Sequence, residues 1–266
     1  MLARVMIPVN LCLCLFASIS YAAEPAEPAP SKENLHIFLL LGQSNMAGRG
    51  KIEEQDKQPH PRVLVFTEQK QWAPAVAPLH FDKPGAGVGP GRTFGIEIAK
   101  AKPGITVGLV PCAHGGSAIS SWEPGGYHAQ TDGHPYDETI ERARAALKNG
   151  TLSGILWHQG ESDCSPERAA VYEEKLHALV ARLRADLNAP NVPFIVGQMG
   201  QFPEKPWSDA KRKVDAVHQD LPKRVANTSF VSSDGLTHKG DAVHFDSASY
   251  RELGRRFAQA YLEMVD

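Results

Sequence analysis

The sequence changes from apolar to polar within one short stretch, HIFLLLGQSNMAG at residues 36–48. Residues 36–41 form a continuous apolar run, which is typical of a strand buried on both faces of a parallel sheet. The glycine and polar residues that follow predict a tight turn into a helix. A serine in such a turn, here Ser44, has an exposed hydroxyl with backbone N–H groups close by. The stretch therefore indicates a strand that ends in a candidate nucleophile, although a polar turn that only caps a helix would look the same.

The rest of the chain alternates similar apolar runs with segments of helical spacing. The other predicted strands are residues 63–66, 106–110, 154–157 and 193–197. The predicted helices are residues 92–101, 136–148, 166–187, 206–219 and 247–263, with Ser165 as the N-cap of the third. Alternating strands and helices predict an α/β fold, a three-layer α/β/α sandwich of the flavodoxin-like, doubly wound kind around a central parallel sheet.

Three long segments, residues 50–62, 67–92 and 113–135, are rich in Gly, Pro and His and show little periodicity. Loops this long inside a compact domain are usually functional. In an open parallel sheet they gather outside the carboxyl ends of the strands, where ligands bind. We therefore expect the functional site at that edge.

The N-terminus has the pattern of an export signal. Arg4 is followed by the mostly apolar residues 7–19 and by small residues that predict cleavage near Ala22 or Ala23. We expect a signal peptide at 1–23, a Glu-, Pro- and Ala-rich tether at 24–34 and a single domain at 35–266. The alternative is an uncleaved anchor, for which the apolar stretch is short. The expected location is outside the cytoplasm, in the periplasm or the medium.

Charge and hydropathy exclude two classes of partner. The formal net charge is −2, and the 22% of residues that are charged alternate in sign along the chain, which does not suit nucleic acid. After signal cleavage no apolar run approaches the roughly 20 residues of a membrane helix, so no membrane association is expected. The sequence does not indicate an oligomeric state.

Four cysteines divide into two pairs. Cys12 and Cys14 lie in the expected signal peptide and would be removed with it. Cys112 and Cys164 would remain in an oxidising compartment, where one disulfide is possible, but buried free cysteines are also common. Both alternatives stay open.

The segment DAVHF at residues 241–245 offers a base for the serine. An acid three residues before a histidine lets Asp241 orient His244 and stabilise its protonated form. The alternative is that His244 caps the last helix while Asp241 is merely solvated. With 11 histidines in the chain, a chance pairing is not negligible.

Two further segments follow predicted strands and can stabilise an oxyanion. In WHQGESD at 157–163, the Gln159 amide can donate a hydrogen bond, and in HGGS at 114–117 the glycines let a backbone N–H approach a ligand. Each segment alone is a weak signal. Together with Ser44 and His244 they predict one hydrolytic site.

At this point the sequence resembles the SGNH hydrolase superfamily, in particular the sialate O-acetylesterase-like group that includes the acetylxylan esterases of carbohydrate esterase family six. The four quoted blocks carry the resemblance, which covers nearly all of the chain after the signal. It implies an SGNH-type esterase domain, no metal and no organic cofactor. It also implies Ser44 as nucleophile, His244 as base, Asp241 as its partner, and an oxyanion hole made by the N–H groups of Ser44 and Gly116 with the Gln159 side chain.

Glu161 is a second acid in the third block that could reach His244. We expect Asp241 to be the main partner of His244, and Glu161 to support the site by holding Gln159 or by a second contact to His244. Sugar binding is expected from the long loops, where Trp72, Trp122, Tyr127 and His128 are candidate stacking groups.

The predicted function is an exported serine esterase that removes O-acetyl groups from glycans of the acetylxylan or sialate type. The alternatives are a lipase or thioesterase acting on non-sugar acyl esters, and a non-catalytic carbohydrate-binding protein. A metallohydrolase is disfavoured, because His114, His128, His134 and His158 lack the close spacing of a zinc site. The glycan and the hydroxyl that carries the acetyl group are not determined by the sequence.

Overall fold

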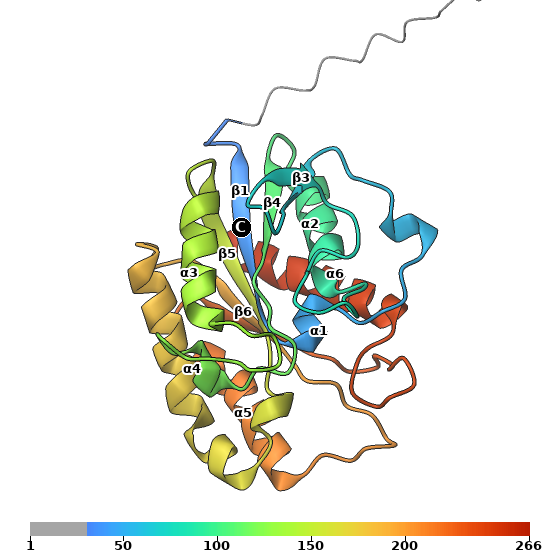
Figure 1. The fold of residues 1–266 in the computed structure, drawn as a ribbon, viewed down its shortest axis with the longest axis vertical. Coiled ribbons are helices and arrows are strands. Elements are labelled where there is room, and N and C mark those ends of the chain that lie inside the picture. The colour runs from blue at the N-terminus through green and yellow to red at the C-terminus, as the bar shows by residue number, and fades with distance from the viewer. Residues whose placement is uncertain (1–30) are drawn as a thin grey trace, which may run out of the picture.

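The computed structural model describes residues 31–266 and contains one seven-stranded sheet in the order β3-β2-β4-β1-β5-β6-β7. All neighbouring strands are parallel except β3, which pairs antiparallel with β2 at one edge. The strands are β1 (Leu35–Gly42), β2 (Val63–Phe66), β3 (Trp72–Pro74), β4 (Thr106–Pro111), β5 (Thr151–His158), β6 (Phe194–Gly197) and β7 (Thr228–Val231). The strand with the quoted apolar run, β1, therefore lies near the middle of the sheet, between β4 and β5 (Figure 1).

Helices cover both faces of this sheet. The helices are α1 (Ser44–Ala47), α2 (Pro90–Ala101), α3 (Pro135–Ala146), α4 (Pro166–Asp186), α5 (Asp209–Arg224) and α6 (Ser247–Val265). Figure 1 shows α2 and α6 on one side of the sheet and α3, α4 and α5 on the other. The predicted three-layer α/β/α sandwich is confirmed.

The side chains of β1 explain why the sheet is covered on both faces. Phe38 and Leu40 pack in the cluster that contains α2 and α6, whereas Ile37, Leu39 and Leu41 pack in the cluster that contains α3, α4 and α5. Successive side chains of a strand point to opposite faces, so a continuous apolar run needs an apolar layer on each side. Burying each such side chain stabilises the fold by roughly 1.5–3 kcal/mol.

The sequence located the helices of more than one turn and five of the seven strands, including the short β2 and β6, but it missed β3 and β7. Ser165 accepts a hydrogen bond from the Arg168 N–H and so caps α4 as predicted. The strands β3 and β7 were not predicted, because β3 has three residues and β7 has only one fully buried side chain. Both lie at edges of the sheet, where the apolar signal is weakest.

The expected signal peptide, and the tether up to residue 30, lie outside the described residues. Within residues 31–266 we find no helix with the length and apolarity needed to cross a bilayer.

Candidate active site

Ser44 is the first residue of α1, directly after β1. The turn depends on Gly42, which has a φ of +125°, and a Cβ at that position would lie 2.1 Å from the His158 carbonyl oxygen. The Gln43 N–H donates to the same oxygen at 2.9 Å. Only glycine allows β1 to end this close to β5, and this approach fixes where the serine begins its helix.

The histidine loop, residues 237–246, brings a base to Ser44. The distance from His244 Nε2 to Ser44 Oγ is 3.0 Å, and that from His244 Nδ1 to Asp241 Oδ2 is 2.7 Å. A carboxylate can only accept, so Nδ1 carries a hydrogen and Nε2 is left to accept from the serine hydroxyl. The two residues singled out at a spacing of three therefore form one relay with Ser44.

Local hydrogen bonds hold Asp241 in its ionised form. Its Oδ1 accepts from the N–H groups of Val243, at 3.0 Å, and His244, at 2.8 Å. Partial burial works to raise the pKa of Asp241, but the hydrogen bonds from the His244 backbone, the His244 ring and Val243 hold that pKa well below its usual range. A permanent anion beside the ring favours a protonated His244 during a reaction.

The glycine loop, residues 114–117, follows β4 and is joined to the turn before Ser44, because the His114 N–H donates to the Gly42 carbonyl oxygen at 2.9 Å. Within the described residues, neither the Ser44 N–H nor the Gly116 N–H has a hydrogen-bond partner. Two unpaired N–H groups near a hydroxyl are what an oxyanion hole requires.

The Gln159 side chain is fully buried, and both its amide nitrogen and its amide oxygen are hydrogen-bonded. Its amide nitrogen donates to the Ser117 carbonyl oxygen at 3.0 Å and to Asp163 Oδ2 at 2.5 Å. Its amide oxygen accepts from the Tyr172 hydroxyl at 2.8 Å. An amide nitrogen has two hydrogens, so in this arrangement Gln159 connects the glycine loop to the segment after β5 and has no free donor.

Glu161 contacts neither of the partners expected for it. Its Oε1 accepts from the Asn45 side-chain nitrogen at 2.6 Å, and it has no hydrogen bond to His244 or Gln159. The Asn45 nitrogen also donates to the Val243 carbonyl oxygen at 3.1 Å, and its oxygen accepts from the Tyr250 hydroxyl at 2.6 Å. The expected contacts of Glu161 are thus wrong, because Asn45 stands between Glu161 and the histidine loop.

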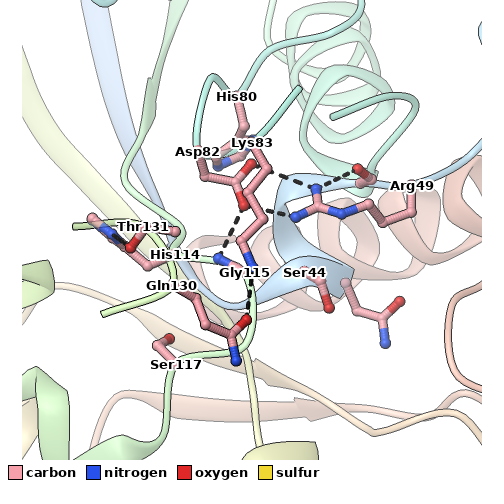
Figure 2. A network of polar contacts seen from close by, with 12 residues as sticks. Ser44, Arg49, His80, Asp82, Lys83, His114, Gly115, Ser117, Gln130 and Thr131 are labelled. Carbon is pink, nitrogen blue, oxygen red and sulfur yellow. Dashed lines mark hydrogen bonds and ion pairs between the residues drawn. The ribbon is translucent and has the colours of Figure 1, made fainter. Parts of the chain in front are cut away.

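Asn45 was missed by the sequence reasoning as a separate site residue. Its position next to the serine in the quoted block was the available signal. Arg49 and Asp82 were also missed: their side chains form an ion pair at 2.7 Å close to Ser44 (Figure 2). No local pattern could reveal that pair, because 33 residues separate its members.

The predicted sugar-stacking residues divide into three cases. Trp122 is completely buried, so its prediction is wrong: the ring packs edge-on against Trp157 beneath the site. Trp72 packs on Phe66 and donates to Asn149, which precedes β5 at the opposite edge of the sheet from Ser44. Tyr127 is 54% exposed, and His128 contacts the glycine loop. Phe81, 41% exposed and adjacent to Asp82, was not singled out.

The histidines considered as metal ligands have separate partners. His114 contacts Thr131, His128 contacts the Gly115 carbonyl, His134 contacts the Gly126 carbonyl and His158 contacts the Gln198 carbonyl. In the part of the chain that the structure describes, no three His, Cys, Asp or Glu side chains are grouped as metal ligands.

Cys112 and Cys164 are both free thiols. Of the two alternatives left open by the sequence, the structure has the unpaired one. Burial raises the pKa of Cys112 to about 11 and that of Cys164 to about 12, so both remain protonated near neutral pH.

Comparisons with known proteins agree with this fold. The family model described as "Carbohydrate esterase, sialic acid-specific acetylesterase" matches residues 34–263. A probable carbohydrate esterase of Arabidopsis thaliana is 33% identical over 264 residues, covering 90% of this chain and 94% of the relative. The X-ray structure of that protein aligns with a TM-score of 0.76 over 87% of this chain and 98% of the other.

Two more distant proteins are also similar. A probable 9-O-acetyl-N-acetylneuraminic acid deacetylase of Escherichia coli (strain K12) is 22% identical over 222 residues, with 66% of this chain and 67% of the relative covered. The crystal structure of NanS aligns with a TM-score of 0.72 at 20% identity, over 89% of this chain and 99% of the other, which supports the fold.

Proposed function

The chain belongs to the carbohydrate esterase family of sialic acid-specific acetylesterases, and from this we propose that it hydrolyses O-acetyl esters on glycans through a covalent acetyl-enzyme on Ser44. Membership makes the protein a carboxylic ester hydrolase of the carbohydrate acetylesterase type. The roles of individual residues and the acetyl-enzyme are part of the proposal.

One observation carries the proposal: a relay runs from Asp241 through His244 to Ser44, with distances of 2.7 and 3.0 Å, beside two unpaired N–H groups. A serine hydroxyl is a weak nucleophile until a base accepts its proton. The N–H groups supply the second requirement, a place for negative charge on the former carbonyl oxygen.

In the first step, Ser44 Oγ attacks the acetyl carbonyl carbon while His244 Nε2 takes the hydroxyl proton. The carbonyl oxygen becomes an oxyanion that accepts hydrogen bonds from the N–H groups of Ser44 and Gly116. The intermediate then collapses, the bond from carbon to the sugar oxygen breaks, and His244 gives its proton to that oxygen. The products of this step are a sugar alcohol and acetylated Ser44.

In the second step, water attacks the acetyl carbon and transfers a proton to His244. The bond from carbon to Ser44 Oγ breaks, the serine recovers its proton from His244, and acetate leaves. Asp241 stays ionised throughout and stabilises the protonated ring. Gln159 holds the Ser117 carbonyl in place in this scheme, while its predicted role as a direct oxyanion donor requires that it exchange one of its present partners.

The direct test is acetate release by the purified protein from O-acetyl sialic acid and from acetylated xylan. S44A is the matched control, because it removes one oxygen and leaves the surrounding packing unchanged. We expect release from at least one glycan that S44A abolishes, and the preferred glycan identifies the substrate class. No release from either glycan or from a small aryl acetate, or equal release by S44A, would contradict the proposal.

We also propose that the chain is exported and that residues 1–23 are removed, as the N-terminal sequence pattern indicates. N-terminal sequencing of the protein recovered from outside the cytoplasm should begin near Glu24. Recovery of the intact chain in the cytoplasm only would contradict export without affecting the catalytic proposal.

A further inference from the structure

Hydrogen bonds hold the backbone of the glycine loop and leave one N–H group, that of Gly116, without a partner among the described residues. From the Gly115 N–H to the Ser117 carbonyl there are six polar backbone groups, and five are hydrogen-bonded within the described residues. The five contacts are Gly115 N–H to Asp82, His128 to Gly115 O, Ser162 to Gly116 O, Ser117 N–H to His114 O, and Gln159 to Ser117 O. The exception is the Gly116 N–H, so the loop presents a single donor in a fixed direction.

Asp82 connects the glycine loop to Arg49, in the segment that follows Ser44 and α1. Its Oδ2 accepts from the Gly115 N–H at 2.9 Å and from Arg49 Nη2 at 2.7 Å (Figure 2). Arg49 comes directly after the Gly48 cap of α1, and its Nη1 donates to the Gly48 carbonyl at 2.8 Å. The carboxylate therefore sits between the segment that follows Ser44 and the peptide that precedes Gly116.

The ion pair is well shielded from water. The side chains of Arg49 and Asp82 are only 11% and 2% exposed. A charge-assisted contact in such surroundings is stronger and more directional than one at the surface. A side chain on Gly115 would collide with it, because a Cβ there would lie 2.4 Å from Arg49 Nη2 and 2.6 Å from Asp82 Oδ2. The ion pair between Arg49 and Asp82 thus explains why residue 115 is a glycine.

We propose that Asp82, held by Arg49, is a positioning residue that sets the Gly116 N–H against the oxyanion formed at Ser44. The inference rests on the proposed function. Asp82 touches neither Ser44 nor the reacting ester in this scheme, so its effect is on turnover and not on binding of the ground-state substrate. A displacement of the loop by a fraction of an ångström weakens a hydrogen bond that forms only in the transition state.

The test compares Asp82 with a structural ion pair of the same burial. Arg251 and Asp56 are 14% and 3% exposed, pair at 2.6 Å and join α6 to residues 54–56 without contacting the glycine loop or the histidine loop. D82A and D82N are therefore measured beside D56A and D56N. The readouts are kcat and KM for an aryl acetate, the Kd of an alkylboronic acid that forms a tetrahedral adduct with the serine, and Tm.

We expect D82A to lower kcat about 100-fold and D82N about 10-fold, with KM within about twofold of wild type. D82N is milder because it keeps an oxygen for the Gly115 N–H while turning an NH₂ group toward Arg49. The boronic acid should lose affinity by a similar factor in each Asp82 variant. D56A and D56N should lower Tm but leave kcat and the boronic acid Kd unchanged.

Two outcomes would overturn the inference, and they differ. If wild type releases acetate and the folded Asp82 variants match the Asp56 variants in kcat and boronic acid affinity, the positioning role is wrong and the esterase stands. If wild type cleaves no acetyl ester, the proposed function fails and the inference fails with it. Should D82A not fold, the isosteric D82N decides between the first outcome and the expected one.

Discussion

The histidine loop and the glycine loop meet at Ser44 but are built in different ways. The histidine loop is held mainly by its own residues: His238 Nδ1 accepts from the N–H groups of Gly240 and Ala242, while Asp241 accepts from those of Val243 and His244. The side chains of the glycine loop's partners lie 33, 13, 46 and 42 residues away along the chain. One loop is a local structure that presents a base, and the other is a product of the whole fold.

This difference predicts how substitutions in each of the two loops should act. A local loop can lose a side chain without loosening the sheet, so its substitutions should affect chemistry far more than stability. The glycine loop is hydrogen-bonded to residues from distant parts of the chain. Its substitutions should therefore affect both chemistry and stability. The predictions below test this contrast, beginning with the largest effect.

Asp241→Ala should lower kcat about 10⁴-fold and should lower the free energy of unfolding only modestly. The physical reason is that His244 loses the anion that orients its ring and stabilises its charge, whereas the lost backbone contacts lie in an exposed turn. Steady-state kinetics and urea unfolding check both parts.

Glu161→Ala is the matched control for that experiment, because Glu161 is the other acid of the site but contacts Asn45 and not His244. We expect it to lower kcat about 10-fold or less. Near wild-type turnover of Asp241→Ala together with abolished turnover of Glu161→Ala would reverse the two roles.

Gln159→Ala should lower kcat about 100-fold and also the free energy of unfolding by several kcal/mol, because buried groups of Ser117, Asp163 and Tyr172 each lose a partner. Tyr172→Phe removes only the donor to the amide oxygen. It should cost about 1–3 kcal/mol of stability, with less than a 10-fold effect on kcat. Lost activity of Gln159→Ala at wild-type stability would indicate a direct oxyanion donor.

We expect acid to destabilise the fold first through its buried histidines. Burial lowers the pKa of His218 to about 3 and that of His80 to about 4, and it also lowers the pKa of His158. The unfolded chain binds protons at these histidines below about pH 6.5. Stability should therefore fall as the pH drops from about 6.5 toward 4, by about 1.4 kcal/mol per pH unit for each fully buried histidine.

The pKa of Asp241 is lowered as well, but its effect on stability appears at lower pH than that of the histidines. Because its pKa is lowered on folding, its contribution is present above the unfolded value, about 3.9, and is lost only at lower pH. Urea unfolding at pH 7.5, 6 and 5 measures the slope, and His218→Gln should make it shallower. A flat stability profile between pH 6.5 and 5 would contradict neutral buried histidines.

The same contrast accounts for what the sequence could predict. The Asp241–His244 pair was found because its contact spans three residues, and the long strands and helices were found because their periodicity is local. The clamp of Arg49 and Asp82, the Asn45 contact of Glu161 and the engagement of Gln159 depend on which strand ends lie side by side. Sheet order fixes those contacts, and no short window of sequence encodes it.

The two free thiols, Cys112 and Cys164, can report on local opening of the fold to solvent. Cys112 follows β4 beside the glycine loop, and Cys164 follows the segment of residues 161–163 with its Sγ 3.2 Å from the Gly160 carbonyl oxygen. With pKa values of about 11 and 12, neither presents much thiolate at pH 8, so alkylating reagents should modify the unfolded chain far faster than the native one. The labelling rates of the two sites then compare, without any introduced probe, how often the segments after β4 and β5, on either side of β1, open to solvent.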